Sequence, residues 1–159
     1  MKKLALYTLI TYMAILLIVP GFLVFCHFDT LTTGEEYKFI VAPYDPYDPF
    51  HGRYVWLMTE QSLRAGRTNP YAILGKDDQG FAVVSSWSGV KPQSGGYVKN
   101  LDLHRYYMNE KMAPEAERIQ RNLGEDDLIY LLVMVKNGNY VIEGLYINDI
   151  PIEEYITGK

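Results

Sequence analysis

An unbroken apolar segment opens the chain, and short alternating patterns of apolar and polar residues fill the rest. Residues 4–28 hold no Asp, Glu, Lys or Arg, and about 20 apolar residues in a helix span a bilayer. Lys2 and Lys3 precede the segment and no basic residue follows it closely, so the positive-inside rule places the N-terminus in the cytoplasm. We therefore predict a single-pass protein in which residues 1–28 form the cytoplasmic N-terminus and the anchor, with the lipid bilayer as the partner of residues 4–28.

A cleaved signal peptide is the alternative interpretation of this segment, because both begin with positive charge. However, the apolar stretch is longer than a typical signal core, and no pair of small residues marks a cleavage site. A lipoprotein anchor would place a small residue before the modified cysteine, whereas Phe25 precedes Cys26. The pattern favours an uncleaved signal anchor, with the C-terminal domain extracytoplasmic, and periplasmic in a cell with two membranes.

Strand-like patterns dominate the region beyond the anchor. Residues 29–36 are polar and are predicted to form a linker, which leaves residues 37–159 as one extracytoplasmic domain. Runs rich in aromatic and β-branched residues predict strands at 37–42, 53–60, 71–75, 81–87, 97–103, 128–136 and 140–148. The sequences KDDQG and Asn137–Gly138–Asn139 are typical of hairpin turns.

One short amphipathic helix is predicted outside the membrane, at residues 114–123. Pro114 suits its first turn, Gly124 can close it, and its apolar residues share one face. Residues 152–159 are expected to be a short tail. This order of elements predicts an α+β fold with a mainly antiparallel sheet, and it leaves open whether the sheet curls into a barrel.

Composition and charge narrow the classes of partner. The 14 tyrosines suit half-buried strands, and the net charge of −4 becomes −6 once Lys2 and Lys3 are set aside. An acidic outer domain is a poor ligand for nucleic acid, so no nucleic-acid partner is expected. Cys26 is the only cysteine, which excludes an internal disulfide.

The most distinctive local sequence is PYDPYDP at residues 43–49. Asp before Pro favours an extended or turning backbone, so Asp45 and Asp48 are interpreted first as turn residues. The alternative is a cation site, but Ca²⁺ requires six to eight oxygens and two carboxylates are too few. The three histidines form no ligand pattern, and no metal or other cofactor is predicted.

Catalytic motifs are missing from the sequence. A signal-peptidase-like hydrolase would need a serine activated by a lysine, for which Lys136 and a few serines are candidates. The candidate serines are Ser62, Ser85, Ser86 and Ser88. None lies in a recognisable motif, so no catalytic residue is assigned and the sequence favours a protein that is not an enzyme.

Two segments carry a resemblance to a known family. Residues 43–57, PYDPYDPFHGRYVWL, resemble the name-giving region of the GDYXXLXY family, and residues 105–115, RYYMNEKMAPE, resemble its second patterned region. Gly52, Tyr54 and Leu57 fit the motif, whereas Arg53 replaces the family's Asp and Thr59 its final Tyr. The resemblance implies a membrane-anchored bacterial protein of unestablished activity, with a multi-pass membrane protein as a partner.

These observations define a set of structural or interface candidates. They are Asp45, Asp48, Gly52, Arg53, Tyr54, Leu57, Arg105, Tyr106, Tyr107, Asn109 and Glu110. The polar stretch 105–110 is interpreted as a network that orients the following helix, in preference to a pocket floor. The leading hypothesis is a non-enzymatic interaction module accessory to another membrane protein. The alternatives are a hydrolase at the membrane surface and a cation- or ligand-binding module at the DPYDP loop.

Overall fold

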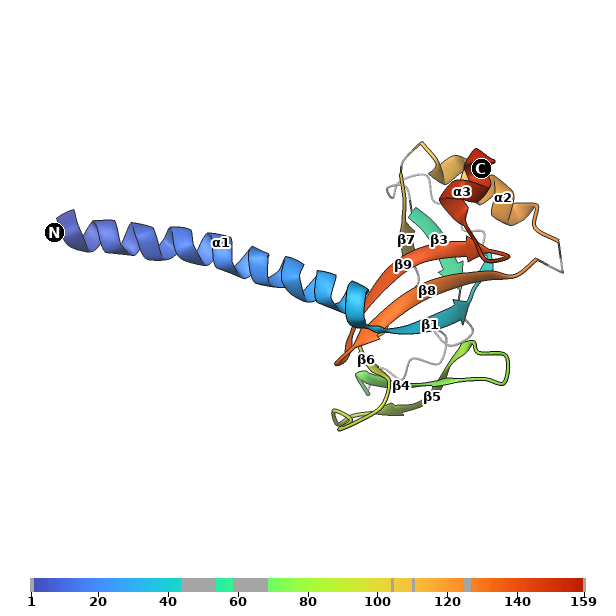
Figure 1. Ribbon diagram of the computed structural model, residues 1–159, viewed down its shortest axis with the longest axis horizontal. Coiled ribbons are helices and arrows are strands. Elements are labelled where there is room, and N and C mark those ends of the chain that lie inside the picture. The colour runs from blue at the N-terminus through green and yellow to red at the C-terminus, as the bar shows by residue number, and fades with distance from the viewer. Residues whose placement is uncertain are drawn as a thin grey trace.

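A long helix projects from a strand-rich domain (Figure 1). The computed structural model describes residues 2–43, 54–58, 69–103, 105–109, 111–124 and 127–158. Helix α1 (Lys2–Thr33) is long and apolar enough to cross a membrane. The later elements are β1 (Glu35–Ile40), β2 (Ala42–Pro43), β3 (Tyr54–Met58), β4 (Tyr71–Lys76), β5 (Ala82–Ser88), β6 (Tyr97–Lys99), β7 (Arg105–Tyr107), α2 (Ala113–Arg121), β8 (Ile129–Lys136), β9 (Asn139–Ile147), β10 (Ile150–Pro151) and α3 (Ile152–Thr157).

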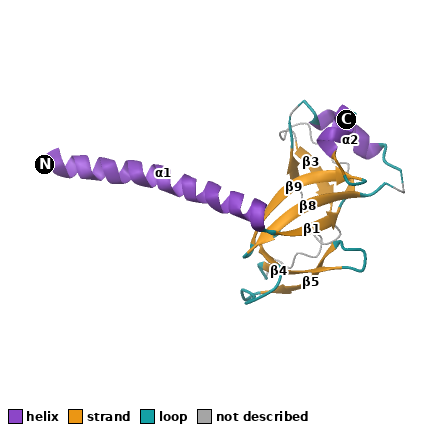
Figure 2. Ribbon diagram, in the orientation of Figure 1, coloured by secondary structure: helices purple, strands orange, loops and turns teal. Residues whose placement is uncertain are grey.

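In the described part of the chain the strands form three antiparallel sheets, with orders β1-β8-β9-β10, β2-β3-β7 and β5-β4-β6. None of them closes on itself, and the short helices α2 and α3 pack together at one end of the domain (Figure 2). The predicted α+β class with a mainly antiparallel sheet is therefore confirmed, and the sheets do not close into a barrel in the residues that the structure describes.

Strand geometry decides which side chains of the largest sheet enter the core. In β8, Leu131 and Val133 point into the core, and they pair in register with Phe39 and Tyr37 of the neighbouring strand β1. Side chains of β9 complete this layer, and Ala72, Leu74 and Val98 of the β5-β4-β6 sheet belong to the same core. Apolar side chains on every second residue therefore hold the sheets together, because each such side chain leaves water.

The hairpin between β8 and β9 confirms the turn predicted at Asn137–Gly138. The backbone φ angles of these two residues are +53° and +87°, which is the left-handed pair that a tight two-residue hairpin requires. The predicted hairpin of β4 and β5 is confirmed as well, with residues 77–80 forming its turn. Both strand pairs are local in sequence, which is why turn chemistry predicts them.

The polar segment after the anchor differs from the predicted linker. Helix α1 continues to Thr33, and β1 begins at Glu35, so only Gly34 separates helix from strand. A Cβ at Gly34 would lie 2.4 Å from the carbonyl oxygen of Thr30, closer than such atoms approach. Residues 29–33 are helical because α1 packs on β8 and β9 there. The hydroxyls of Thr30, Thr32 and Thr33 donate to carbonyl oxygens one turn back, so these polar groups are satisfied within the helix.

The C-terminal segment corrects the prediction of a tail. Ile152 to Thr157 form α3, whose first residue is fully buried and whose first turn carries two acidic residues. Gly158, with a left-handed φ of +67°, caps the C-terminus of α3. Helix α2 is confirmed with slightly shifted bounds, although Asn122 and not Gly124 caps it. Tertiary burial of Ile152, which sequence periodicity does not report over six residues, stabilises α3.

Candidate functional site

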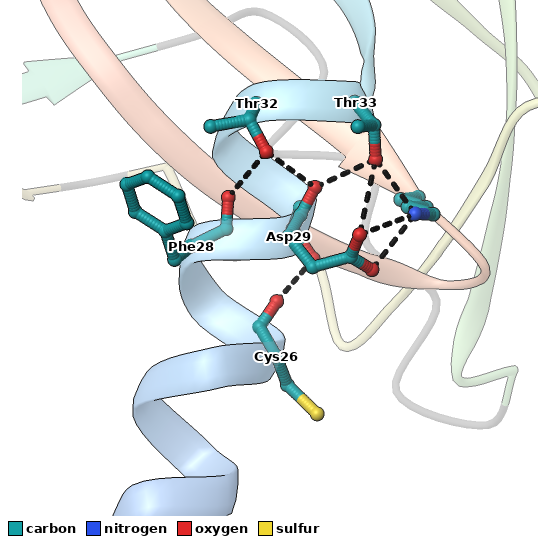
Figure 3. Close-up of polar contacts among 7 residues, drawn as sticks. Cys26, Phe28, Asp29, Thr32 and Thr33 are labelled. Carbon is teal, nitrogen blue, oxygen red and sulfur yellow. Dashed lines mark hydrogen bonds and ion pairs between the residues drawn. The ribbon is translucent and has the colours of Figure 1, made fainter.

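The junction of α1 with the large sheet is the best-defined polar site in the described chain. Lys136, the last residue of β8, donates to both carboxylate oxygens of Asp29 at 2.7 Å and to Thr33 Oγ1 at 2.6 Å. In Figure 3 the dashed lines from Asp29 and Thr33 converge on this ammonium nitrogen. An ammonium has three protons to donate, so all three meet oxygens of α1. We call Asp29, Thr33 and Lys136 the junction cluster.

Partial burial makes the junction cluster more than a loose surface pair. The side chains of Lys136 and Asp29 are 30% and 37% exposed, so water screens their attraction only in part. Thr30, one residue after Asp29, is almost fully buried, and its hydroxyl donates to the carbonyl oxygen of Cys26 at 2.9 Å. The last turn of α1 is thus packed and hydrogen-bonded as part of the domain.

A second polar group lies on the outer face of the same sheet. The Tyr130 hydroxyl donates to Asp149 Oδ1 at 2.6 Å, and its ring stacks on Tyr146 with centroids 5.4 Å apart. Lys38 Nζ lies 4.9 Å from the Tyr130 ring centroid and 3.4 Å from the same Asp149 oxygen. Burial, followed by the bond to Asp149, raises the pKa of Tyr130, and the Tyr130 bond in turn lowers the pKa of Asp149. The phenol therefore stays protonated and acts as a structural donor.

Strand β7 connects the sheets to the C-terminal helix. Tyr106 is buried and its hydroxyl donates to Glu153 Oε1 in α3 at 2.7 Å. Burial, followed by the bond to Glu153, raises the pKa of this phenol. Asn109 then forms the turn before α2, because its side chain accepts from Lys111 N at 3.0 Å and its carbonyl accepts from Met112 N and Ala113 N. Tyr106 and Asn109 thus link β7 to both short helices.

The two sequence regions singled out earlier meet in one sheet. Tyr54 pairs in register with Tyr107, and Trp56 with Arg105, although about fifty residues separate the two strands. The side chain of Tyr107 is 70% exposed. The side chains of Tyr54, Leu57 and Arg105 are not described. The remaining predicted site residues lie outside the described residues, and they are Asp45, Asp48, Gly52, Arg53 and Glu110.

The comparison with protein families decides the classification. The model of the GDYXXLXY protein family matches residues 16–145, which run from the middle of α1 into β9. The chain belongs to the GDYXXLXY family. No curated protein and no solved structure matches the chain. The matched range includes both motif strands, β3 and β7, and all three residues of the junction cluster.

The hydrolase interpretation finds no support in the described part of this GDYXXLXY protein. Lys136 directs its ammonium to α1, and no described serine accepts from it. Ser85 and Ser86 are exposed on β5, while the Ser88 hydroxyl donates to the carbonyl oxygen of Val90 at 2.7 Å. Ser62 lies outside the described residues. Among those described, no group of three or more His, Cys, Asp or Glu is placed to hold a metal ion.

The sequence missed the junction cluster because its members are ordinary residues at distant positions. Asp29 and Lys136 lie 107 residues apart, and the segment of Asp29 was interpreted as a linker. Two signals were present: an Asp directly after an apolar helix, and a Lys at the end of an apolar strand beside an Asn-Gly turn. Opposite charges at a hairpin turn and at a helix end can form an ion pair when the two lie side by side. The sequence does not show which hairpin lies beside the helix.

Proposed function

We propose that this GDYXXLXY protein is a single-pass membrane protein whose outer domain is mounted rigidly on its anchor and binds another protein of the same membrane. The observation that carries the proposal is the junction cluster, which joins α1 to the sheet with a single intervening glycine. A module that only needed tethering would tolerate a flexible linker, whereas a fixed joint holds one face of the domain in one orientation.

Exposure along α1 supports the anchor. From Leu6 to Phe28 its large apolar side chains are exposed, and nothing in the described domain covers them. Exposed apolar surface of this extent requires a lipid or protein environment, because water would oppose it. A signal sequence has the same composition, but here the last turn of α1, with buried Thr30, is part of the domain packing. Cleavage within α1 would leave that turn without the helix that supports it.

Helix length supports a junction at the membrane surface. From Lys3 to Asp29 a helix rises about 39 Å, whereas the hydrocarbon core is about 30 Å thick. With Lys2 and Lys3 in the cytoplasmic headgroups, as the positive-inside rule directs, Asp29 falls in the opposite headgroup layer. The domain is therefore extracytoplasmic and lies directly on the bilayer, which limits its reach to partners in the same membrane.

A rigid mount increases the chance of a productive encounter with such a partner. It confines the domain to a narrow range of heights and angles, which raises the effective concentration of its binding face. The β3–β7 strand pair is our candidate face, since it unites the two motif regions and exposes Tyr107, a residue type enriched at interfaces. The lateral restriction favours a partner in the same membrane, and the family resemblance implies that this partner is a multi-pass membrane protein.

Site-specific photo-crosslinking in intact native membranes tests this proposal. A photoreactive amino acid replaces Tyr107 in one variant, and in a matched control it replaces Asp78, an exposed residue in the β4–β5 turn. We expect a discrete adduct with one membrane protein from position 107 and none from position 78, with a lower yield when Asp29→Asn weakens the junction. Equal adducts from both positions, or none from either while the chain resists carbonate extraction, would refute the partner and leave the anchor standing.

A further inference from the structure

The loop between β5 and β6, residues 89–96, projects from the end of the domain at which α1 attaches. Tyr71 of β4 pairs with Ser88 of β5 on one side and with Lys99 of β6 on the other, so these three residues lie side by side at the same end of the sheet. Lys99 N donates to the carbonyl oxygen of Gly138 at 2.9 Å, and Gly138 lies in the turn next to Lys136 of the junction cluster. Figure 1 shows the β5–β6 loop on the side from which α1 leaves.

At the start of this loop stands Val90, whose side chain is 78% exposed. Leu17, in the middle of α1, is 77% exposed, so Val90 is as open as an apolar residue of the proposed anchor. The Ser88 hydroxyl donates to Val90 O at 2.7 Å and accepts from Val90 N at 3.1 Å. These bonds hold the Val90 backbone in a tight turn, and the side chain has no described neighbour that removes it from solvent.

The segment around Val90 is positively charged, whereas the domain as a whole is acidic. No Asp or Glu occurs between Asp78 and Asp102, and this stretch contains the exposed Lys91 and Lys99. The chain beyond its first three residues has a net charge of −6, so this basic stretch is a local exception. Each Lys near an anionic bilayer is attracted to the headgroups, and an apolar side chain adds to the binding by entering the interface.

The position, the exposure and the charge of this loop all indicate the lipid bilayer as its partner. We propose that residues 89–96 form a second membrane contact, in which Val90 enters the lipid interface and Lys91 and Lys99 face anionic headgroups. This inference depends on the proposed anchor, which brings the junction cluster, and with it the sheet end that contains Ser88 and Lys99, to the bilayer surface. Two contacts, one helix and one loop, fix the rotation of the domain about α1, which a single helix leaves free.

A fluorescence experiment on the full chain tests the loop contact. Cys26 is replaced by Ala, and an environment-sensitive nitrobenzoxadiazole probe is attached through Val90→Cys, with Asp78→Cys in the opposite turn as the matched control. The protein is reconstituted in vesicles of phosphatidylcholine alone or mixed with phosphatidylglycerol, each with nitroxide-headgroup lipid as quencher. We expect quenching at position 90 to exceed that at position 78 by about twofold or more, as for a side chain in the interface.

Lysine substitutions and extraction separate the possible outcomes. Lys91→Gln together with Lys99→Gln should reduce the quenching at position 90 in the phosphatidylglycerol vesicles more than in phosphatidylcholine alone. Equal quenching at positions 90 and 78, in a chain that carbonate does not extract, would overturn the loop contact while the anchor stands. Extraction of the chain by carbonate would overturn the anchor, and the loop contact with it.

Discussion

Helix α1 and strands β8 and β9 are built from the same apolar residue types but bury them in opposite ways. Leu17 in α1 is 77% exposed, whereas Leu131 and Leu145 in the sheet are fully buried. Successive side chains of a strand point to opposite faces, so one face of β8 and β9 meets a core assembled from other parts of the same chain. The helix is apolar all round, and nothing in the described part of the chain covers it. The difference shows that the apolar side chains of the domain are buried by the domain itself, whereas those of α1 need lipid or another protein to cover them.

Polar groups in the two regions differ in the same manner. In the domain, hydroxyls and charges find partners far along the chain, as Tyr106 does with Glu153 and Tyr130 with Asp149. Within α1, the Thr11 hydroxyl donates to the carbonyl oxygen of Tyr7 one turn back. A helix that satisfies its polar side chains internally can enter lipid, where unpaired polar groups are costly. The junction cluster is where one arrangement gives way to the other.

The largest expected effect comes from one substitution made in both regions. Leu145→Ala should lower the free energy of unfolding of the domain by about 2–5 kcal/mol, because it leaves a cavity in a filled core. Leu17→Ala should leave that free energy unchanged, since Leu17 touches no part of the domain. Urea unfolding of the full chain in detergent micelles, followed by tryptophan fluorescence, measures both. Similar losses from the two variants would contradict the separation of α1 from the core.

A smaller effect is expected at the junction between the regions. Lys136→Met removes three hydrogen bonds of a half-buried cluster and should lower the free energy of unfolding by about 1 kcal/mol. Arg118→Met is the matched control, because it removes an exposed pair with Glu115 within α2.

The clearer readout at the junction is geometric. With spin labels at Phe22→Cys and Asp78→Cys in a Cys26→Ala background, Lys136→Met should broaden the distance distribution between helix and domain. Arg118→Met should leave that distribution unchanged. An equally narrow distribution in both variants would show that helix packing alone, and not the junction cluster, holds the joint.

The smallest effect concerns pH and distinguishes the domain from α1. Burial raises the pKa of Tyr37 to about 12, and it also raises the pKa values of Tyr106 and Tyr130. Between pH 10 and 12 the unfolded chain therefore releases protons that the folded domain keeps, so stability present below pH 10 is lost as the pH rises. The free energy of unfolding, measured by urea titration, should therefore fall between pH 9 and pH 11. Tyr106→Phe should reduce the fall by under about 1 kcal/mol, and a fall that Tyr106→Phe leaves unaltered would exclude this phenol as its source.

Local patterns explain why much of the fold was predictable. The Asn137–Gly138 turn, the apolar run of β8 and the one-sided apolar face of α2 each depend on residues close in sequence. Strand β7 and helix α3 escaped prediction because they are short and are stabilised by partners elsewhere, such as the Tyr106–Glu153 bond. The pairing of β3 with β7 also joins distant segments, so the neighbourhood of the candidate residues Tyr54 and Tyr107 could not be predicted.

From residue order alone follow an apolar helix, a set of antiparallel strands and the family, because periodicity, turn chemistry and motifs are written in neighbouring residues. The folded chain adds what neighbours cannot specify: that Asp29 is helical and bound to Lys136, that a single glycine joins α1 to β1, and that the Val90 loop lies at the end where α1 attaches. These features depend on which segments, about a hundred residues apart in the sequence, pack against each other in the fold. The packing of these distant segments is set by burial of a core to which all three sheets contribute.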